Sequence, residues 1–444
     1  MASTTPLSAV LEVVPEVEHA FGYGSGVFAQ PQASASDDAH ADAVRRASGD
    51  AASAPTRGTP TMVDYVFAVR SPLEWHVENM RRNPSHYAPH LRALGPAAVV
   101  AIADRVGVGV HFNTLVPWRG AADAGSTLGP GHATHYKYGV VRLDTLCDDL
   151  TEWRSLFLAG RMQKPVAALD PGDDDARDEN ARAAVAAAST ANLRAALAAA
   201  LLTLPETFSA EALRVALVGL SYRGDVRTWL GAEDRHKVAR IAAGSAAAMD
   251  ALYAPVAAEA RAASVGLTRV EGNGTRGSGG AWGQDKSQAA TRFLCRWLPR
   301  SALGALGERT GPRPGPGPGP DDAEAAAARA ASRRDLGPAL LRHVDATVRR
   351  SSLRQIAASA LATSPGKAAA YTAAKFAKSA ASREGEILQA GIVDSVGRRG
   401  ERSRLWPRRE RGGLGHRGQA SALFRDGREF RSHLLKSARG PPHI

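Results

Sequence analysis

Two short segments near the N-terminus constrain the fold more than any other part of the chain. Residues 21–28 (FGYGSGVF) contain an apolar segment that leads into a Gly-Ser-Gly turn at 24–26. Residues 63–69 (VDYVFAV) form an apolar strand interrupted by one carboxylate, Asp64. Glycine leaves no Cβ in the way, so backbone N–H groups and a serine hydroxyl can approach phosphate closely. A strand beside such a turn holds its carboxylate where a divalent cation can bridge it to phosphate.

This pairing is similar to the triphosphate and metal site of polymerase-β-type nucleotidyltransferases. The resemblance implies that Ser25 and the backbones of Gly24 and Gly26 hold the β- and γ-phosphates, while Asp64 ligates Mg²⁺. Such sites usually carry two carboxylates spaced D-x-D, yet position 66 is Val66. The identity of the second metal ligand is therefore open among three candidates, Asp225, Asp144 and Glu78.

Further short blocks follow these two segments in order. They are residues 75–79 (WHVEN), 83–87 (NPSHY), 107–116 (GVGVHFNTLV), 137–141 (KYGVV), 159–166 (AGRMQKPV), 204–206 (LPE), 219–227 (GLSYRGDVR) and 350–355 (RSSLRQ). In this order the blocks resemble the mitochondrial CDP-diacylglycerol synthase family, also called the mitochondrial translocator assembly and maintenance family. The likeness runs from about Phe21 to about Lys378.

The family resemblance implies a function. Members transfer CMP from CTP to phosphatidic acid with Mg²⁺, giving CDP-diacylglycerol and pyrophosphate for phosphatidylglycerol and cardiolipin synthesis. A rival hypothesis is nucleotidyl transfer to a protein or RNA end, although no array of RNA-stacking aromatics is visible and no nucleic acid is expected. Another is a non-enzymatic mitochondrial maintenance factor, which the absent second carboxylate favours and the intact Ser25 and Asp64 oppose.

The cations of the chain suit this chemistry. A phosphate monoester is already an anion, so its attack on an α-phosphate needs charge neutralisation and alignment more than a strong base. Lys137 precedes a strand, and Arg161 and Lys164 flank a turn, where each suits phosphate or is simply a solvated surface cation. The predicted catalytic residues are Asp64, Ser25, Lys137 and Arg227, and the predicted binding residues are Gly24, Ser25, Gly26, Arg223 and Lys237.

The loop of residues 221–227 supplies two of those cations. It follows an apolar helix and combines glycine, Asp225 and two arginines, of which Arg227 suits a bidentate phosphate contact with Asp225 orienting it. The alternative is a structural turn.

Histidines and amides offer weaker signals. His76 and Asn79 share one helix face, and a structural role is the expectation for His76, with Trp75 in the core. Asn113 on a strand either recognises a base edge or is a satisfied buried amide. His111 and His135 have no partners at metal-ligand spacing, so they receive no role.

Composition limits the remaining choices. The net charge of +12 suits nucleotides, nucleic acid or anionic lipid. The two cysteines, Cys147 and Cys295, exclude a disulfide framework and a zinc cluster and fit a reducing compartment. No spanning helix is expected, because residues 181–204 carry Arg182, Asn192 and Arg194 and are typical of an alanine-rich soluble helix.

The expected location follows from the resemblance alone. It implies a peripheral protein on the matrix side of the mitochondrial inner membrane, which meets CTP, phosphatidic acid and an anionic membrane surface. The N-terminus is not typical of an Arg-rich transit peptide, since Glu12, Glu16 and Glu18 precede any arginine.

The expected fold class is α/β (α+β). Residues 108–116 and 136–143 have strand patterns, residues 145–158 a helical one, and residues 71–74 (SPLE) form a capping box with Pro at the first helical position. We expect a polymerase-β-type nucleotidyltransferase domain at 1–170, with a flexible insertion at 31–61.

A mainly helical winged-helix-like domain and a C-terminal helix are expected to follow. Within the former, Ser209 is expected to cap a helix through Leu217, and another helix is expected over 235–252. The predicted parts are the helical domain at 180–262, a linker-rich region at 263–335 that includes the glycine-rich stretch 266–280, a basic helical segment at 336–382 and a disordered basic tail at 383–444.

The last helical segment has an amphipathic pattern. Leu353, Ile356, Ala360 and Leu361 lie near one face, and lysines 367, 375 and 378 follow. A basic amphipathic helix can lie in the interface of an anionic membrane. The alternative is a helix packed on the catalytic domain, and the interruption of the helix by Pro-Gly at residues 365–366 favours it.

Overall fold

The computed structural model describes residues 6–24, 26–28, 62–118, 133–169, 176–229, 236–263, 265–270, 281–307 and 320–363. All of them lie in the first of two compact units, residues 1–388. Several sequence expectations fall outside the described residues, namely Ser25, the insertion 31–61, the lysines at 367, 375 and 378, and the tail 383–444.

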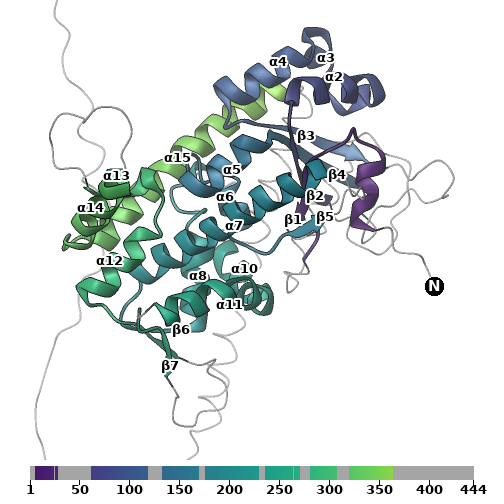
Figure 1. Ribbon diagram of the computed structural model, residues 1–444. Coiled ribbons are helices and arrows are strands. Elements are labelled where there is room, and N and C mark those ends of the chain that lie inside the picture. The colour runs from purple at the N-terminus through teal and green to yellow at the C-terminus, as the bar shows by residue number, and fades with distance from the viewer. Residues whose placement is uncertain are drawn as a thin grey trace, which may run out of the picture. The chain divides into compact units, whose positions relative to one another are not determined.

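A five-stranded mixed sheet forms the N-terminal part of this unit (Figure 1). Its strands are β1 (His19–Tyr23), β2 (Met62–Val69), β3 (Val110–Pro117), β4 (His135–Arg142) and β5 (Ala167–Leu169). They run in the order β3-β4-β2-β1-β5, with β2 and β4 parallel and the other neighbours antiparallel. The fold is therefore mixed α/β, as the sequence predicts.

The two faces of the sheet enter different hydrophobic clusters, because successive strand residues point to opposite sides. Phe21, Val66 and Val141 belong to the large cluster shared with the helices of the unit. Tyr65 and Phe67 belong to a second cluster with Trp75 and the N-terminal 3₁₀ helix η1 (Leu7–Glu12). Asp64 alternates with Tyr65 along β2, so its side chain lies on the same face as Val66, the face that packs in the large cluster.

A layer of short helices follows β2. It consists of α2 (Pro72–Arg82), η2 (Pro84–His86), α3 (Pro89–Leu94), α4 (Pro96–Ala101) and η3 (Ile102–Val106). The start of α2 is set as the capping pattern predicts, because the Ser71 hydroxyl accepts a hydrogen bond of 3.4 Å from the Glu74 N–H.

Helix α5 (Leu143–Glu152) ends earlier than the predicted 158. Trp153 takes a left-handed conformation with φ 49°, which stops the helix. The buried Asp149 carboxylate then accepts hydrogen bonds from four N–H groups, those of residues 155, 156, 158 and 159. This anchored loop leads into α6 (Ala159–Met162), which carries the candidate cation Arg161, and Lys164 follows just after the helix.

The helical part is built around α7 (Ala176–Thr203). The remaining helices are α8 (Ala210–Gly219), α9 (Val226–Trp229), α10 (Lys237–Gly244), α11 (Ala246–Ala262), α12 (Gln288–Arg296), α13 (Arg300–Gly307), α14 (Pro320–Ala331) and α15 (Leu336–Ala362). Ser209 caps α8 as predicted, with its hydroxyl accepting from the Ala212 N–H at 3.0 Å. The helix predicted over 235–252 is instead two helices, bent by 76° at Ser245.

The region predicted as linker-rich, 263–335, contains elements that the prediction missed. Strands β7 (Thr268–Val270) and β8 (Ala281–Gly283) pair with β6 (Thr207–Ser209) in a three-stranded sheet of order β6-β8-β7. Helices α12, α13 and α14 bury residues such as Leu294, Leu303 and Ala327 in the large cluster. The glycine-rich composition of the neighbouring stretches hid these short elements.

Helix α7 is long and apolar enough to cross a membrane by length and composition alone, although the sequence predicts no spanning helix. The most apolar 18-residue window within residues 179–203 has a mean hydropathy of 1.5, and 56% of that window is buried within the protein. Every residue from Ala195 to Leu201 is buried in the large cluster. We therefore assign α7 as the central core helix.

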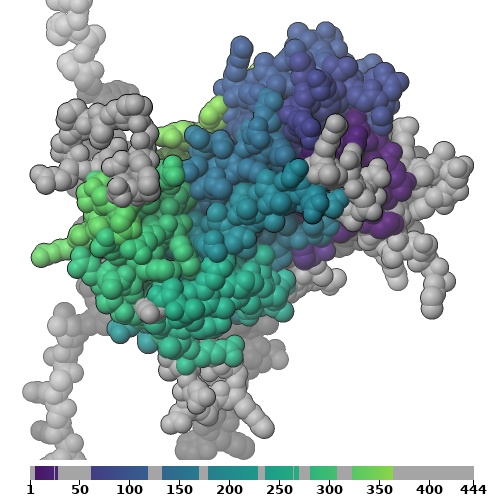
Figure 2. Space-filling view, viewed as in Figure 1, coloured from purple at the N-terminus to yellow at the C-terminus, as the bar shows by residue number. Residues whose placement is uncertain are grey.

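Helix α15 joins the two ends of the unit. Leu336 and Leu340 pack in the helical part, while Arg354 donates hydrogen bonds to the carbonyls that end η3. The space-filling view shows its residues at both places, beside α13 and α14 and beside α2–α4 (Figure 2). Up to Ala362 the helix is therefore packed on the protein. Its outer face remains apolar, with Leu353 and Ile356 53% and 39% exposed.

Candidate functional site

The glycine turn lies against the start of β2. Tyr23, the last residue of β1, pairs in register with Asp64, and Gly24 follows with φ +84°. A side-chain carbon at Gly24 would lie 3.6 Å from Asp64 Oδ2, and one at Gly26 would lie 2.4 Å from the Met62 carbonyl oxygen. The sequence needs glycine here because the turn passes directly over the strand and its carboxylate.

Asp64 has a cation beside it. Lys137 is its register partner on the parallel strand β4, and Lys137 Nζ lies 3.7 Å from Asp64 Oδ1. The same ammonium group lies 4.4 Å from the centre of the Phe112 ring. Both side chains keep some exposure, 18% for Lys137 and 26% for Asp64. The carboxylate is thus held in place while remaining accessible to a ligand.

Arg161 on α6 continues this cluster. Its guanidinium carbon lies 3.8 Å from the centre of the Phe157 ring and 5.2 Å from that of Tyr23, and it donates a hydrogen bond to the Phe157 carbonyl. Its Nε is buried without a hydrogen-bond partner in the described part of the chain. A buried donor without a partner costs free energy, which an anionic ligand would recover.

Two lysines meet at the Ser221–Tyr222 loop. Lys164 Nζ donates to the Gly160 carbonyl and, at 2.9 Å, to the Ser221 hydroxyl. Lys164 and Lys237 place their ammonium groups 5.5 and 5.4 Å from the centre of the Tyr222 ring. Glycine at 160 permits this approach, because a side-chain carbon there would lie 2.3 Å from Ser221 Cβ.

The neighbouring cations contribute to a lowered pKa of Lys164. Burial first, then repulsion from Arg161 and Lys237, lowers the pKa of Lys164 from 10.5 to about 7. Like charges held together in a partly buried site are unfavourable unless an anion joins them. This group of basic residues, Lys137, Arg161, Lys164 and Lys237, is called the cation cluster below.

The two predicted arginines of the 221–227 loop have protein carboxylates as partners. Arg227 is held by buried Asp225, with Nε 3.0 Å from Oδ1, which is the orienting contact that the sequence predicts. Arg223 forms a two-point ion pair of 2.8 and 3.2 Å with Asp345 on α15. The described contacts of Arg223 therefore fasten the loop to α15, and Arg223 does not join the cation cluster.

The three candidates for a second metal ligand differ in their surroundings. Asp225 holds Arg227, Glu78 accepts hydrogen bonds from Arg81 and Arg82, and Asp144 is exposed in the first turn of α5. Within the described ranges, no group of three or more His, Cys, Asp or Glu side chains could hold a metal ion. One accessible carboxylate still fits Mg²⁺, which is commonly held by one or two carboxylates together with substrate phosphates and waters.

Buried polar side chains from α2 and from the sheet form a network on the opposite face. His76 Nδ1 and Asn79 Nδ2 lie 2.7 and 2.8 Å from the Tyr87 hydroxyl, and Asn113 donates to the Tyr138 hydroxyl at 2.9 Å. Burial lowers the pKa of His76 well below its usual value. Asn113 is thus a satisfied buried amide, and His76 is structural, as expected.

Sequence reasoning missed the aromatic members of the site. Tyr23, Phe112, Phe157 and Tyr222 each lie under a cation of the cluster. Most of them stand in blocks that carry the family resemblance, but an aromatic residue gives no sign in sequence of which cation it will meet. Figure 1 shows the segments involved, β1, β2, β4 and α6, gathered beside α7.

Comparison with known sequences decides the family. Residues 7–378 match the family described as "Phosphatidate cytidylyltransferase, mitochondrial". The chain belongs to this family. The family assignment made from the ordered blocks is thereby confirmed.

Individual relatives in this family agree over about half of the chain. A protein of Xenopus laevis named "Phosphatidate cytidylyltransferase, mitochondrial" is 39% identical over 248 residues, 56% of this chain and 61% of the relative. Proteins of the same name from Drosophila melanogaster and Homo sapiens are 40% and 35% identical, covering 54% and 55% of this chain and 64% and 44% of the relatives. The chain thus spans less than two thirds of the length of these relatives.

Proposed function

We propose that this protein transfers CMP from CTP to phosphatidic acid, giving CDP-diacylglycerol and pyrophosphate. The observation that carries the proposal is the accessible Asp64 carboxylate beside the Gly24 turn, facing a cluster of cations. Relatives named phosphatidate cytidylyltransferase support the substrates. The product feeds phosphatidylglycerol and cardiolipin synthesis.

The chemistry is a displacement at phosphorus. An oxygen of the phosphatidate monoester attacks the α-phosphorus of CTP and forms a new P–O bond, while the bond to the β-phosphate breaks and pyrophosphate leaves. When bound, Mg²⁺ supplies positive charge that neutralises the phosphate oxygens. Asp64 would hold the ion, and Lys137 and Arg161 neutralise charge that develops on the phosphates. Ser25, with the backbones of Gly24 and Gly26, holds the β- and γ-phosphates.

The remaining cations serve both substrates. Lys164, which donates to the Ser221 hydroxyl, adds positive charge for the phosphates of CTP, and Lys237, whose ammonium group lies at the same Tyr222 ring, neutralises the phosphatidate monoester. Arg227, oriented by Asp225, is one third exposed and is the arginine of its loop that we assign to substrate. Arg223 positions the loop through Asp345.

The finer fold and location belong to the same proposal. We assign the five-stranded sheet to a polymerase-β-type nucleotidyltransferase domain and the helical part with its small sheet to a winged-helix-like domain. The protein works at the matrix side of the mitochondrial inner membrane as a peripheral protein. Support for the location comes from relatives named as mitochondrial and from the exposed apolar face of α15.

The direct test offers one nucleotide and several acceptors. Purified protein, α-labelled CTP and Mg²⁺ are incubated with phosphatidic acid liposomes, an RNA with a free 3′ end, or mitochondrial protein. We expect label in CDP-diacylglycerol alone, and none without Mg²⁺. Label in RNA or protein would instead support the rival acceptor, and label in no product would support the non-enzymatic maintenance factor.

A further inference from the structure

A second basic hollow lies in the helical part, formed by elements other than those that carry the cation cluster. Its volume is ≈ 710 Å³, within the ~300–1,000 Å³ typical of small-molecule sites. It is lined by the end of α7, the segment joining β8 to α12, the start of α12, the end of α14, the segment joining α14 to α15 and the start of α15. The described residues that line it include three cations, and none of the lining residues is acidic or aromatic.

The three cations differ in what already holds them. Arg333 pairs with Asp335 and donates to the Leu306 carbonyl. Lys286 donates one hydrogen bond of 2.7 Å to the Leu201 carbonyl, which leaves its other donors available. Arg334 is exposed and has no hydrogen-bond or ion-pair partner among the described residues.

Acidic groups close to the hollow already have other partners. Asp335 accepts from Arg342 and Arg333, and these contacts hold the pKa of its carboxyl below the usual value. Glu324 is likewise held by Arg292 and Arg296. Asp285, next to Lys286 in the sequence, accepts hydrogen bonds from the N–H and the hydroxyl of Ser287. Among the described residues, none of these carboxylates forms an ion pair with Lys286 or Arg334, which favours an anionic ligand in the hollow.

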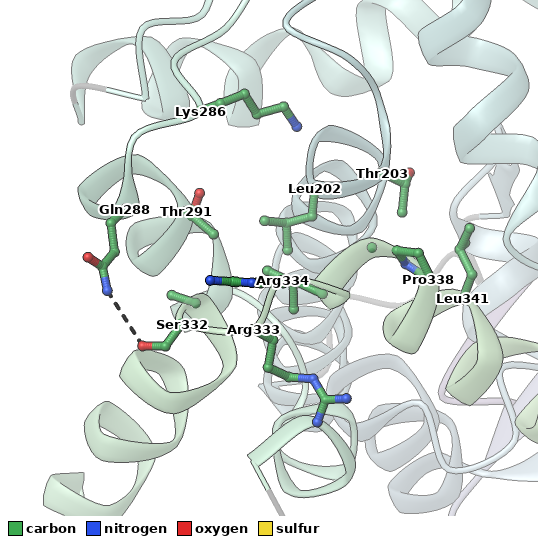
Figure 3. Close-up of a pocket in the computed structure, with 13 residues that line it drawn as sticks. Leu202, Thr203, Lys286, Gln288, Thr291, Ser332, Arg333, Arg334, Pro338 and Leu341 are labelled. Carbon is green, nitrogen blue, oxygen red and sulfur yellow. Dashed lines mark hydrogen bonds between the residues drawn. The ribbon is translucent and has the colours of Figure 1, made fainter.

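The rest of the lining is apolar on one side. Leu202, Leu336, Pro338 and Leu341 form a wall next to the two cations. Figure 3 shows Lys286 on one side of the hollow and Arg334 on the other, with Leu202 between them. A nucleotide would leave its base without an aromatic surface on which to stack, whereas an acyl chain matches aliphatic side chains.

We propose that this hollow binds an acidic phospholipid, with Lys286 and Arg334 contacting the headgroup phosphate and the apolar wall contacting the first part of an acyl chain. The site is separate from the reaction centre and holds a lipid that is not consumed. A lipid bound in the hollow would hold the helical part of the protein at the membrane surface.

The test uses a lipid that stays monomeric. Binding of dihexanoyl-phosphatidylglycerol to the full chain is measured by calorimetry below its micelle concentration, beside dihexanoyl-phosphatidylcholine and inorganic phosphate. We expect the phosphatidylglycerol to bind at least about tenfold more tightly than either, a difference of about 1.4 kcal/mol. Equal binding of inorganic phosphate would overturn the lipid claim, and equal binding of phosphatidylcholine would overturn the role of charge.

Variants locate the binding. Arg334→Glu should weaken phosphatidylglycerol binding about tenfold or more, Arg334→Lys should retain most of it, and Arg300→Glu, an exposed arginine on α13, should leave it unchanged. Unchanged binding by Arg334→Glu would show that the hollow is not the site. Asp64→Asn should bind the lipid normally while failing in cytidyl transfer, so a failure of the proposed enzyme function would be seen separately.

Discussion

Lys164 is the residue whose chemistry depends most on its neighbours. The folded chain releases its proton near pH 7, whereas the unfolded chain holds it up to about pH 10.5. Through that window the unfolded state binds more protons, so the free energy of unfolding rises with pH as the unfavourable buried charge is removed. Binding of an anion has the opposite dependence, because it requires the ammonium form.

This gives a pH prediction for nucleotide binding. Above about pH 7, the affinity for CTP should fall by up to about tenfold per pH unit, since one proton must be taken up on binding. Lys164→Met should bind CTP weakly and with little pH dependence between pH 7 and 9. The measurement is the dissociation constant of CTP at three pH values, without phosphatidic acid.

Lys286→Met provides the matched control for Lys164→Met. Burial also lowers the pKa of Lys286, but its ammonium group caps the Leu201 carbonyl outside the cation cluster. This variant should keep the pH dependence of the wild-type protein. A Lys164→Met protein with the wild-type pH profile would show that another group takes up the proton.

At the scale of elements, the contact of α6 with the 221–227 loop holds the two sides of the site together. Gly160→Ala would place a carbon 2.3 Å from Ser221 Cβ, so α6 and the loop must move apart. We expect the free energy of unfolding to fall by about 1–3 kcal/mol, the usual cost of overpacking. We also expect kcat to fall, because the two sides of the site are then held apart. Denaturant titration and initial rates measure the two effects.

Gly219→Ala is the control for this substitution. Gly219 ends α8, and a side-chain carbon there would meet nothing within 4 Å. This variant should be as stable as the wild type or slightly more so, because alanine favours a helix. Equal behaviour of the two alanine variants would mean that the α6–loop contact is not needed for the site.

The elements also show what the sequence reveals and what it hides. Strands β2 and β4 and the start of α2 follow from alternation and capping, which are local signals. Strands β7 and β8 have three residues each and exist because they pair with one another and with β6, so no local pattern announces them.

The site divides in the same way. The glycine turn and Asp64 are readable because each belongs to a short local motif, a strand leading into a turn and a strand carrying one carboxylate, although residues 31–61 separate the two motifs. The partner of Arg223 is Asp345, 122 residues away, so its pairing cannot be read locally. The grouping of Arg161 and Lys164 with Lys237 also depends on a tertiary contact, that of Gly160 with Ser221. Residue types are thus predictable here, while their partners are not.

At the scale of the whole molecule, the net charge of +12 and the outer face of α15 bear on membrane docking. Leu353→Glu combined with Ile356→Glu should weaken co-sedimentation with cardiolipin-containing vesicles, since apolar insertion is lost and negative charge is repelled. Added salt should weaken binding of the wild-type protein by screening. Ala251→Glu on α11 is the exposed control and should bind nearly as the wild type does. Equal sedimentation of all three proteins would show that this face does not meet the membrane.

The most direct test of cytidyl transfer at Asp64 is the initial rate of CDP-diacylglycerol formation from CTP and phosphatidic acid by Asp64→Asn. This variant removes the carboxylate charge at nearly constant shape. We expect the rate to fall at least about a hundredfold, while the unfolding midpoint stays near that of the wild type. Asp148→Asn, an exposed carboxylate on α5, should retain nearly the full rate. A fully active Asp64→Asn protein would contradict the assignment of the reaction centre.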